Sequence, residues 1–373
     1  MKVLINCQLR RGASAVFSLE LAKGLKKSGV DVYAVLSKDI ENMQEWRDVL
    51  GDNNIYWAKT HRDKDKLDFV ISTVQFILFG MYEINQKFKN VQFDVSLRTF
   101  YSHWAPLVDY SIKKDKIVTI CHDPEMHSGT KKYMKKLYFY HVAQANDVFV
   151  LTKSFKSIVE KNYNIPIDKV HYVPHGRMQM YKERQDKKYN MNYSKEKTNF
   201  LFFGRIEKYK GLHVLAEACK ILYTRRSDFT LTIAGNGDFG DYEESFKLLE
   251  NVNIINRFIP DEEVGCLFDG NNIITVLPYI DATQSGVIPI AFEYETPVIA
   301  SNTGGIMEQL DDGKIGVFFE NGDAKDLADK MEYLMDNSHE VFYQKILMQK
   351  YRNTLNWDVI AQQFIKELYE RVE

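Results

Sequence analysis

The sequence predicts an α/β fold in which two doubly wound parallel sheets follow one another along the chain. Three observations lead to this prediction. A length of 373 residues is more than one hydrophobic core usually holds. Short apolar runs alternate with helical patterns, which is typical of βαβ units. The alternation stops at residues 183–198, which contain almost nothing apolar, and then starts again.

The first half opens with a complete βαβ unit. Val3 to Ile5 is a short apolar run, and the loop that follows holds Gly12. Residues 16–28 have helical spacing and stop at Gly29, and residues 30–36 alternate as a second strand. Further strands of this half are expected at residues 93–96, 117–121, 147–151 and 170–173.

The second half repeats the pattern. Residues 199–203 predict a strand and residues 211–223 the helix after it. Further strands are expected at residues 229–234, 254–255, 273–277 and 297–301, and a closing helical pattern runs from about residue 341 to 371 with a break near 353–357. We therefore expect a first domain of residues 1–182, a linker of 183–198 and a second domain of 199–354.

Composition excludes several classes of protein. The chain is 45% hydrophobic and 27% charged, which is typical of a globular protein and too apolar for disorder. No two of its four cysteines form a CxxC pair, which argues against a disulfide scaffold or a zinc ribbon and favours a reducing cytoplasm. The first residues do not resemble a signal peptide. The longest apolar stretch, Phe69 to Tyr82, is shorter than the ~20 residues of a membrane span, so we expect no bilayer crossing.

Charge is distributed unevenly along the chain. Residues 1–200 carry a net charge of +11 and the remainder −13, which favours an anionic partner for the first half. Ordinary variation between domains explains the difference equally well. Within the segment from residue 131 to 140, lysines alternate with aromatic residues; these lysines are Lys131, Lys132, Lys135 and Lys136. This pattern suits peripheral contact with an anionic membrane, and a solvated amphipathic helix is the alternative.

The clearest chemical signal follows the strand at 199–203. Gly204 and Arg205 come directly after this strand, and Lys210 stands just before the next helix. Two cations at a helix N-terminus form an anion site suited to phosphate, since Arg205 can hold two oxygens and Lys210 adds a point charge. Taken alone, such a pair often only faces solvent.

Other segments make the signal specific through their order and spacing. They are Ile233–Gly237, Asn256–Pro260, Leu277–Tyr279, Asp281–Pro289, Thr296–Ser301 and Gly304–Glu308, together with Gly12, Thr119–Asp123 and Val173–Gly176 in the first half. This arrangement resembles the retaining glycosyltransferases of family 4, bacterial polysaccharide-type enzymes of glycosyltransferase group 1 with the GT-B fold. The resemblance covers essentially the whole chain, is strong over residues 200–330, and is weaker over 40–115.

The resemblance implies a fold and a function. The fold would be two Rossmann-like domains facing a central cleft, with the C-terminal helix at about 355–373 returning to the first domain. The function would be transfer of a hexosyl or acetylhexosaminyl group from a nucleotide-diphosphate sugar to a glycan or lipid-linked glycan, with retention, in cell-surface polysaccharide synthesis. A UDP-sugar is slightly favoured as co-substrate. No other cofactor and no nucleic acid partner are implied, and the location would be cytoplasmic, at the inner face of the membrane.

The resemblance also assigns roles to residues. Arg205 and Lys210 match the pair that neutralises the leaving diphosphate, and His122 matches a histidine that orients the donor sugar or the acceptor. Gly12 matches a backbone donor to the same phosphates. The donor-binding positions carried over are Gly12, Gly204, Arg257, Phe258, Asp281, Gln284, Ser285, Gly286, Val287, Gly304 and Gly305. The backbone at Arg257 and Phe258 would read the base, and the turn from Gln284 would meet phosphate and sugar.

One departure leaves alternatives open. The family has two glutamates where this chain has Ala282 and Ile290, and Asp281, Gln284 or Glu293 would have to replace the one that holds the ribose. A nucleotide-sugar epimerase on the same fold and a non-catalytic partner are therefore the competing interpretations. No acidic pair or cluster has metal-ligand spacing, so we expect a metal-independent reaction. His103 and Trp104 are interpreted as structural, with an acceptor pocket as the alternative.

Overall fold

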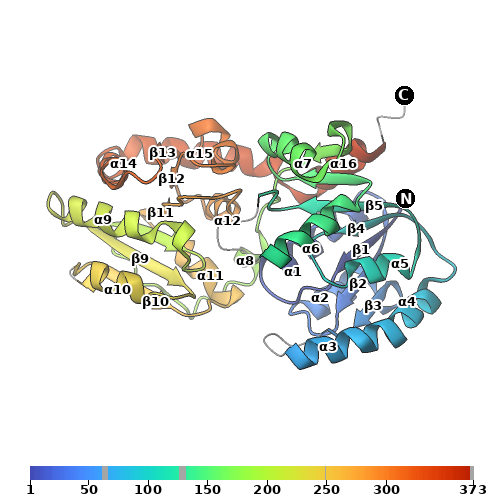
Figure 1. Ribbon diagram of the computed structural model, residues 1–373. Coiled ribbons are helices and arrows are strands. Elements are labelled where there is room, and N and C mark those ends of the chain that lie inside the picture. The colour runs from blue at the N-terminus through green and yellow to red at the C-terminus, as the bar shows by residue number, and fades with distance from the viewer. Residues whose placement is uncertain (61–65, 126–131, 248, 370–373) are drawn as a thin grey trace. The chain divides into compact units, whose positions relative to one another are not determined.

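The computed structural model describes residues 1–60, 66–125, 132–247 and 249–369. The chain forms two compact units (Figure 1): Met1–Gly176 together with Leu355–Glu373, and Arg177–Thr354. Each unit contains one parallel sheet with helices packed on it. The predicted fold class, two α/β units built on parallel sheets, is confirmed.

The first unit contains a seven-stranded sheet in the order β3-β2-β1-β4-β5-β6-β7. Its strands are β1 (Lys2–Cys7), β2 (Asp31–Ser37), β3 (Ile55–Ala58), β4 (Gln92–Arg98), β5 (Lys113–Cys121), β6 (Asp147–Val150) and β7 (Val170–Tyr172). Its helices are α1 (Ala13–Lys27), α2 (Met43–Leu50), α3 (Lys66–Gln75), α4 (Met81–Phe88), α5 (Ala105–Tyr110), α6 (Lys132–Ala143), α7 (Lys156–Tyr163) and α16 (Trp357–Tyr369). Every recorded strand pair in this sheet is parallel.

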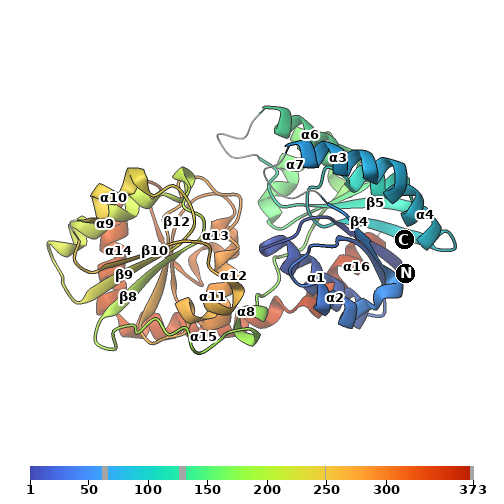
Figure 2. The same ribbon diagram turned by 90° about the horizontal axis from the view of Figure 1, so that it is seen from below.

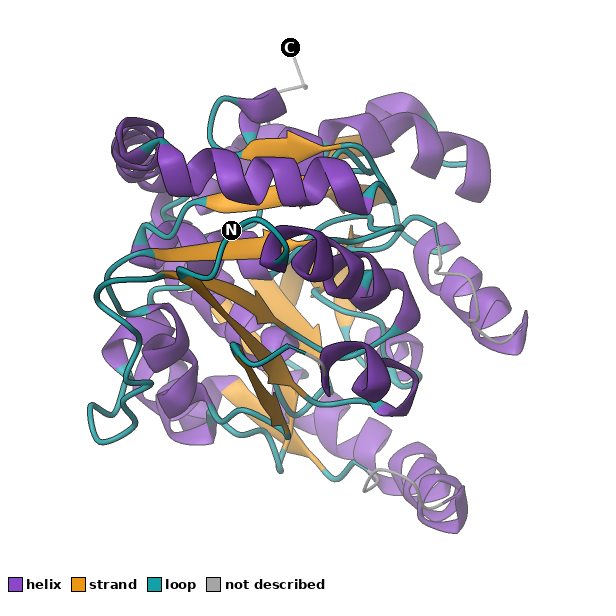
Figure 3. Cartoon of the chain, turned by 90° about the vertical axis from the view of Figure 1, so that its left-hand side faces the viewer, coloured by secondary structure: helices purple, strands orange, loops and turns teal. Residues whose placement is uncertain are grey.

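The second unit contains a six-stranded parallel sheet in the order β10-β9-β8-β11-β12-β13. Its strands are β8 (Thr198–Phe203), β9 (Phe229–Gly235), β10 (Val252–Asn256), β11 (Ile273–Leu277), β12 (Val298–Ser301) and β13 (Val317–Phe319). Its helices are α8 (Met180–Glu183), α9 (Leu212–Tyr223), α10 (Gly240–Lys247), α11 (Asp261–Phe268), α12 (Val287–Tyr294), α13 (Ile306–Gln309), α14 (Ala324–Asp336) and α15 (Ser338–Thr354). Helices lie outside and strands inside (Figure 3).

Strand β1 shows why these apolar runs become central strands. It pairs in parallel with two neighbours, so that Ile5 lies beside Ala34 on one side and Leu97 on the other. All three side chains are buried. A parallel strand covered on both faces needs a nearly continuous apolar run, and this is what the sequence supplies at residues 3–5.

The C-terminal helix belongs to the first unit. Figure 2 shows α16 beside α1. A Cβ added to Gly24 would lie 2.3 Å from the carbonyl oxygen of Trp357, so only glycine permits this approach. The Lys27 ammonium also forms an ion pair with the Asp358 carboxylate at 2.8 Å. The described part of this C-terminal segment, residues 355–369, thus completes the first unit's core.

The expected domain boundary is corrected by the structure. The chain divides between residues 176 and 177 rather than at 182, and the supposed linker of 183–198 packs within the second unit. Arg184 forms an ion pair with Asp261 at 2.8 Å, and the Tyr193 hydroxyl donates to the carbonyl oxygen of Leu267 at 2.8 Å. Because these contacts are polar, the lack of apolar residues in 183–198 did not indicate that the segment packs on the second unit.

The apolar stretch after residue 66 is longer than the sequence pattern indicated. Leu67–Phe88 is one helical segment of 22 residues, long and apolar enough to cross a bilayer by length and composition alone. Our expectation that this stretch is too short is therefore wrong. Only 22% of its most apolar window is buried within the protein, and the wide turn at Phe76–Gly80 joins α3 to α4 without a break.

Candidate functional site

The loops at the carboxyl edge of the second sheet hold most of the predicted site. Strand order reverses at β8, which lies between β9 and β11. In open parallel sheets, ligands bind beyond the carboxyl ends of the strands at such a reversal. The loops that begin at Gly204, Asn236, Pro278 and Asn302 all start at this edge.

Lys210 is held in this edge by two tyrosines. Its ammonium lies 3.7 Å from the ring centroid of Tyr279 and 5.1 Å from that of Tyr209. Tyr279 is fully buried, so it fixes the position of the cation. Burial lowers the pKa of Lys210 to about 8, and the nearby positive charge of Arg205 acts in the same direction. Lys210 is a poorly solvated cation, and an anionic ligand would stabilise its charge.

The loop before α9 is fixed to the loop after β11. Gly211 has φ +69°, and a Cβ there would lie 1.7 Å from the carbonyl oxygen of Pro278. The backbone N–H of Ile280 also donates to the carbonyl oxygen of Tyr209 at 2.9 Å. Only glycine fits between these backbones, so the position of Lys210 depends on Gly211.

A second close approach joins the loops after β11 and β12. Gly304 has φ +50°, and a Cβ there would lie 1.7 Å from the carbonyl oxygen of Ala282. Gln309 fixes the same region, because its side chain accepts from the Ser285 N–H at 2.7 Å and donates to the Ser285 carbonyl at 3.2 Å. The Ser285 hydroxyl accepts from the N–H of Val287 at 3.2 Å. Two of the N–H groups expected to meet the ligand therefore already have partners in the protein.

Arg205 is far more exposed than Lys210. Its side chain is 77% exposed and forms an ion pair with Glu207 at 3.2 Å. An exposed pair of this kind is worth little, so an anionic ligand can compete with Glu207 for the guanidinium. The backbone beside it is well held, since the Gly204 N–H donates to the carbonyl oxygen of Ala234 at 3.0 Å.

The segment expected to read the base lies after β10. The Arg257 guanidinium pairs with the Glu263 carboxylate, which raises the pKa of Arg257. It also donates to the carbonyl oxygen of Phe258 at 3.2 Å. The Phe258 ring is 57% exposed, and its apolar face is open for stacking against a base.

Glu293 is excluded as the replacement for the missing ribose ligand. It is 2% exposed and receives two hydrogen bonds from the Arg177 guanidinium, at 2.8 and 2.9 Å. Nor is Glu293 a helix-surface residue, although it lies in α12. Ala282 and Ile290 are buried, so they face the core rather than a ligand. Asp281 is exposed at the loop surface. With Glu293 excluded, Asp281 and Gln284 are the two candidates to replace the glutamate that holds the ribose in the family.

His122 lies at the carboxyl edge of the first sheet. Its Nε2 donates to the carbonyl oxygen of Thr99 at 2.9 Å, which fixes the ring. The ring stacks on Phe100 at 3.8 Å between centroids, and the edge of Phe17 lies 5.0 Å away. Burial lowers the pKa of His122 to about 4. The imidazole is therefore neutral near pH 7 and suited to hydrogen bonding rather than to carrying charge.

Gly12 caps the N-terminus of α1 with φ +69°, a backbone conformation that favours glycine. Its N–H, expected to reach phosphate, donates to Glu41 Oε1 at 2.7 Å. The Glu41 N–H in turn donates to the carbonyl oxygen of Arg10 at 2.9 Å. The Glu41 carboxylate thus accepts the hydrogen bond from the Gly12 N–H, which the resemblance assigns to a phosphate oxygen. Sequence spacing gave no signal for Glu41.

A cavity of about 440 Å³ opens at the same edge of the first sheet. His103 and Trp104 line it, with Arg10, Arg11, Phe69 and Met134 among the other lining residues. Trp104 is 3% exposed and stacks between Phe69 and Phe76, so its structural interpretation agrees with its burial. His103 instead has its Nδ1 at 2.9 Å from the Tyr101 hydroxyl.

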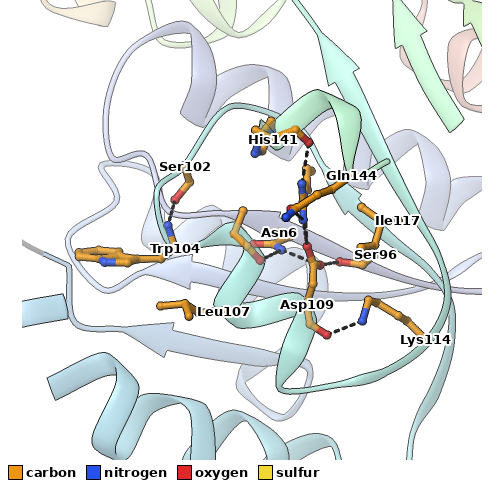
Figure 4. Close-up of polar contacts among 12 residues, drawn as sticks. Asn6, Ser96, Ser102, Trp104, Leu107, Asp109, Lys114, Ile117, His141 and Gln144 are labelled. Carbon is orange, nitrogen blue, oxygen red and sulfur yellow. Dashed lines mark hydrogen bonds and ion pairs between the residues drawn. The ribbon is translucent and has the colours of Figure 1, made fainter. Parts of the chain in front are cut away.

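A buried polar network lies within the first unit (Figure 4). Asp109 accepts from Asn6 at 3.0 Å, from the Arg98 guanidinium at 2.6 Å and from Ser96. Arg98 also donates to the carbonyl oxygen of His141 at 2.7 Å, near the end of α6. Burial lowers the pKa of His141 to about 3, so this ring adds no charge beside Arg98. One ion pair therefore ties α5 and α6 to the sheet.

The predicted site residues separate by unit. Gly12 and His122 belong to the first unit, and all the others belong to the second. Sequence reasoning missed Glu41, Gln309 and the role of Tyr279, although Tyr279 stands in a motif segment. Across the described residues, no group of three or more His, Cys, Asp or Glu side chains is placed to hold a metal ion.

Comparisons with known proteins agree with this arrangement. The family model for glycosyl transferases group 1 matches residues 182–352, and that for glycosyltransferase family 4 matches residues 14–177. A protein from the cps region of Klebsiella pneumoniae is 26% identical over 59% of this chain and 62% of its own length. An uncharacterized glycosyltransferase from Methanocaldococcus jannaschii is 26% identical over 64% of each chain. The chain therefore spans somewhat less than two thirds of these relatives.

Solved structures show the same fold. A glycosyltransferase from Rickettsia africae has a TM-score of 0.66 at 19% identity, covering 99% of this chain and 98% of that one. An Anabaena protein solved with UDP and glucose has a TM-score of 0.71 at 15% identity, covering 99% of each chain. With both family models matched in order along the sequence, the chain belongs to the group 1, family 4 glycosyltransferases of the GT-B fold.

Proposed function

We propose that the chain transfers a sugar from a nucleotide-diphosphate sugar to a glycan or lipid-linked glycan. The observation that carries this proposal is Lys210, a half-buried cation held over Tyr279 at the carboxyl edge of the second sheet. A cation in that position is suited to a diphosphate. The Anabaena neighbour solved with UDP and glucose supports a UDP-sugar as donor.

Catalysis would be chiefly electrostatic. As the bond to the diphosphate breaks, negative charge grows on the leaving oxygens, where Lys210 and Arg205 stabilise it. The acceptor oxygen forms its bond to the anomeric carbon on the face that the phosphate leaves, and its proton passes to the departing phosphate, so the configuration is retained. Neutral His122 orients the donor sugar or the acceptor through hydrogen bonding. No resident metal or other cofactor is needed for these steps.

The finer assignment is to a hexosyl or acetylhexosaminyl transfer in cell-surface polysaccharide synthesis. A Staphylococcus aureus relative, 28% identical over 36% of each chain, is named a capsular polysaccharide biosynthesis glycosyltransferase, which supports that role. The four cysteines are free and buried, which suits a reducing cytoplasm. We place the enzyme there, at the inner face of the membrane.

The test is to incubate the chain with a panel of UDP-, GDP- and ADP-sugars and to measure released nucleoside diphosphate. Slow release from one class of donor is the expected result, because water replaces the missing acceptor. Proton NMR of the remaining nucleotide sugar reveals an epimerase if a new sugar appears without release. Absence of any turnover, in a chain that still binds a nucleoside diphosphate, contradicts the proposal and favours a non-catalytic partner.

A further inference from the structure

The helical segment Leu67–Phe88 carries two apolar stripes. One stripe faces the core at intervals of four residues, and its buried members include Phe76, Ile84 and Phe88. The other faces solvent, and each of its members is at least 46% exposed: Leu67, Val70, Ile71, Val74, Ile77, Leu78, Phe79 and Tyr82. Residues 69–82 include no charged side chain. The protein therefore leaves a long apolar helix face uncovered, which in water is unfavourable.

This segment is fixed along its length to the first unit. The Trp104 Nε1 donates to the Thr73 hydroxyl at 3.0 Å, and the Tyr56 hydroxyl donates to Glu83 at 2.6 Å. Lys87 donates to the carbonyl oxygen of Asp52 at 2.9 Å. A helix that crossed a bilayer would lose these bonds and uncover its buried stripe, so the contacts favour a helix lying on a surface.

Exposed lysines lie on α6, a helix that lines the same cavity as α3. Phe69 of α3 and Met134 of α6 line the same 440 Å³ cavity, so the two helices flank it. Lys132, Lys135 and Lys136 on α6 are exposed, and so are the rings of Tyr133 and Tyr140 and the side chain of Leu137. Lys131, part of the same expected patch, lies outside the described residues. An apolar helix face beside exposed lysines and aromatic rings is complementary to a bilayer with anionic headgroups.

We propose that the exposed stripe of Leu67–Phe88, together with the lysines of α6, docks the first unit on an anionic lipid bilayer. The helix lies in the plane of the headgroups with its exposed stripe inserted, and the lysines contact the acidic lipid. This deepens the proposed function, since a docked cavity lies beside lipid-linked substrates. The apolar face, which the lysine pattern alone did not indicate, inserts into the bilayer, and the lysines make the attachment depend on anionic lipid.

The experiment measures cosedimentation of the full chain with vesicles of phosphatidylcholine containing phosphatidylglycerol, with no donor or acceptor present. We expect binding at low salt, little binding to phosphatidylcholine alone, and weakening as salt rises. Because no turnover is measured, failure here does not touch the glycosyltransferase proposal. A wild-type chain that stays in the supernatant overturns the docking proposal.

A matched pair of double variants tests the helix face. Ile77→Glu with Leu78→Glu should weaken vesicle binding by about tenfold or more, because two inserted side chains become charged. Phe342→Glu with Tyr343→Glu in α15 changes two neighbouring residues of similar exposure, 65% and 55%, and should bind as wild type. Equal loss in both pairs, or in neither, contradicts the assignment. Thermal unfolding confirms that each variant is folded.

The lysines are tested separately. Each lysine near an anionic surface contributes a gain in partitioning of about fivefold, so losing Lys132, Lys135 and Lys136 should reduce binding by about a hundredfold, and reversing all three to Glu should reduce it further. Unchanged binding in the triple Glu variant contradicts the electrostatic part of the proposal.

Two further measurements test whether the exposed stripe is covered by a second copy of the chain, or whether the helix spans the bilayer. Analytical ultracentrifugation that finds a wild-type dimer, made monomeric by Ile77→Glu with Leu78→Glu, shows that a second copy covers the stripe. Vesicle-bound protein that resists alkaline carbonate shows a spanning helix. Either result overturns docking in the plane of the headgroups, and release by carbonate supports it.

Discussion

The surroundings of Lys210 determine when this residue carries its charge. An ordinary lysine stays protonated well beyond neutral pH, but burial lowers the pKa of Lys210 to about 8. The residue is therefore charged at pH 7 and loses its proton as the pH rises through about 8. Its stabilisation of a diphosphate should disappear over the same range.

A pH profile tests this directly. We expect kcat/KM for the donor to be level below pH 8 and to fall above it by about tenfold per pH unit, because the charged free enzyme is the active form. A bound diphosphate favours the charged lysine, so the limb in kcat should lie at higher pH. Lys210→Arg should remove the limb, since arginine stays protonated. A flat kcat/KM up to pH 10 contradicts the role of Lys210.

Single substitutions separate the two cations from their neighbours. Lys210→Ala and Arg205→Ala should each reduce turnover about a hundredfold, the loss typical of one preorganised charge donor. Lys208→Ala is the matched control, because this exposed lysine stands in the same loop, and its turnover should stay near wild type. Near wild-type turnover in either of the first two variants removes that residue from the mechanism.

Local spacing predicted the cations but not the partners of other site residues. Arg205 and Lys210 follow directly from a strand that leads into a helix. Glu293 could not be interpreted in the same way, because its partner Arg177 stands 116 residues earlier in the chain. The bond from Gly12 to Glu41 spans 29 residues and joins two loops. Contacts of this kind depend on how elements pack, which one sequence does not specify.

At the scale of elements, the Arg98–Asp109 pair holds helices on the first sheet. Both side chains are at most 4% exposed, and removing one partner leaves a buried charge. Asp109→Ala should therefore destabilise the first unit by about 3–5 kcal/mol, measured by urea unfolding. Asp228→Ala, in an exposed pair with Arg226, is the control and should cost no more than about 1 kcal/mol. Similar losses in the two variants contradict a special role for the buried pair.

Central strands and edge strands differed in how well the sequence predicted them. Buried apolar runs marked β1 and β8, which lie inside their sheets. No strand was expected at β3 or β13, which are edge strands of four and three residues, although the edge strands β7 and β10 were expected at residues 170–173 and 254–255. Both β3 and β13 are apolar runs, of four and three residues, and a run this short does not by itself distinguish a strand from a buried loop or a helix fragment. The helix of residues 67–88 was underestimated because polar residues after Tyr82 ended the apolar pattern but not the helix.

At the scale of the whole molecule, the sequence predicted the number of units better than their boundary. Alternation restarting near residue 199 marked a second sheet. The boundary was displaced because residues 177–198 attach to the second unit through polar contacts such as Arg184 with Asp261. Glu293 does not replace the family's ribose glutamate, since it pairs with Arg177 across 116 residues of sequence.

In our proposal, the second unit binds a nucleoside diphosphate through Lys210 without a metal. The most direct measurement is isothermal titration of the full chain with UDP in EDTA. We predict binding that EDTA leaves unchanged, that weakens about tenfold or more in Lys210→Ala, and that stays at the wild-type level in Lys208→Ala. UDP that binds only after Mg²⁺ is added, or that binds Lys210→Ala as tightly as the wild type, would contradict the claim.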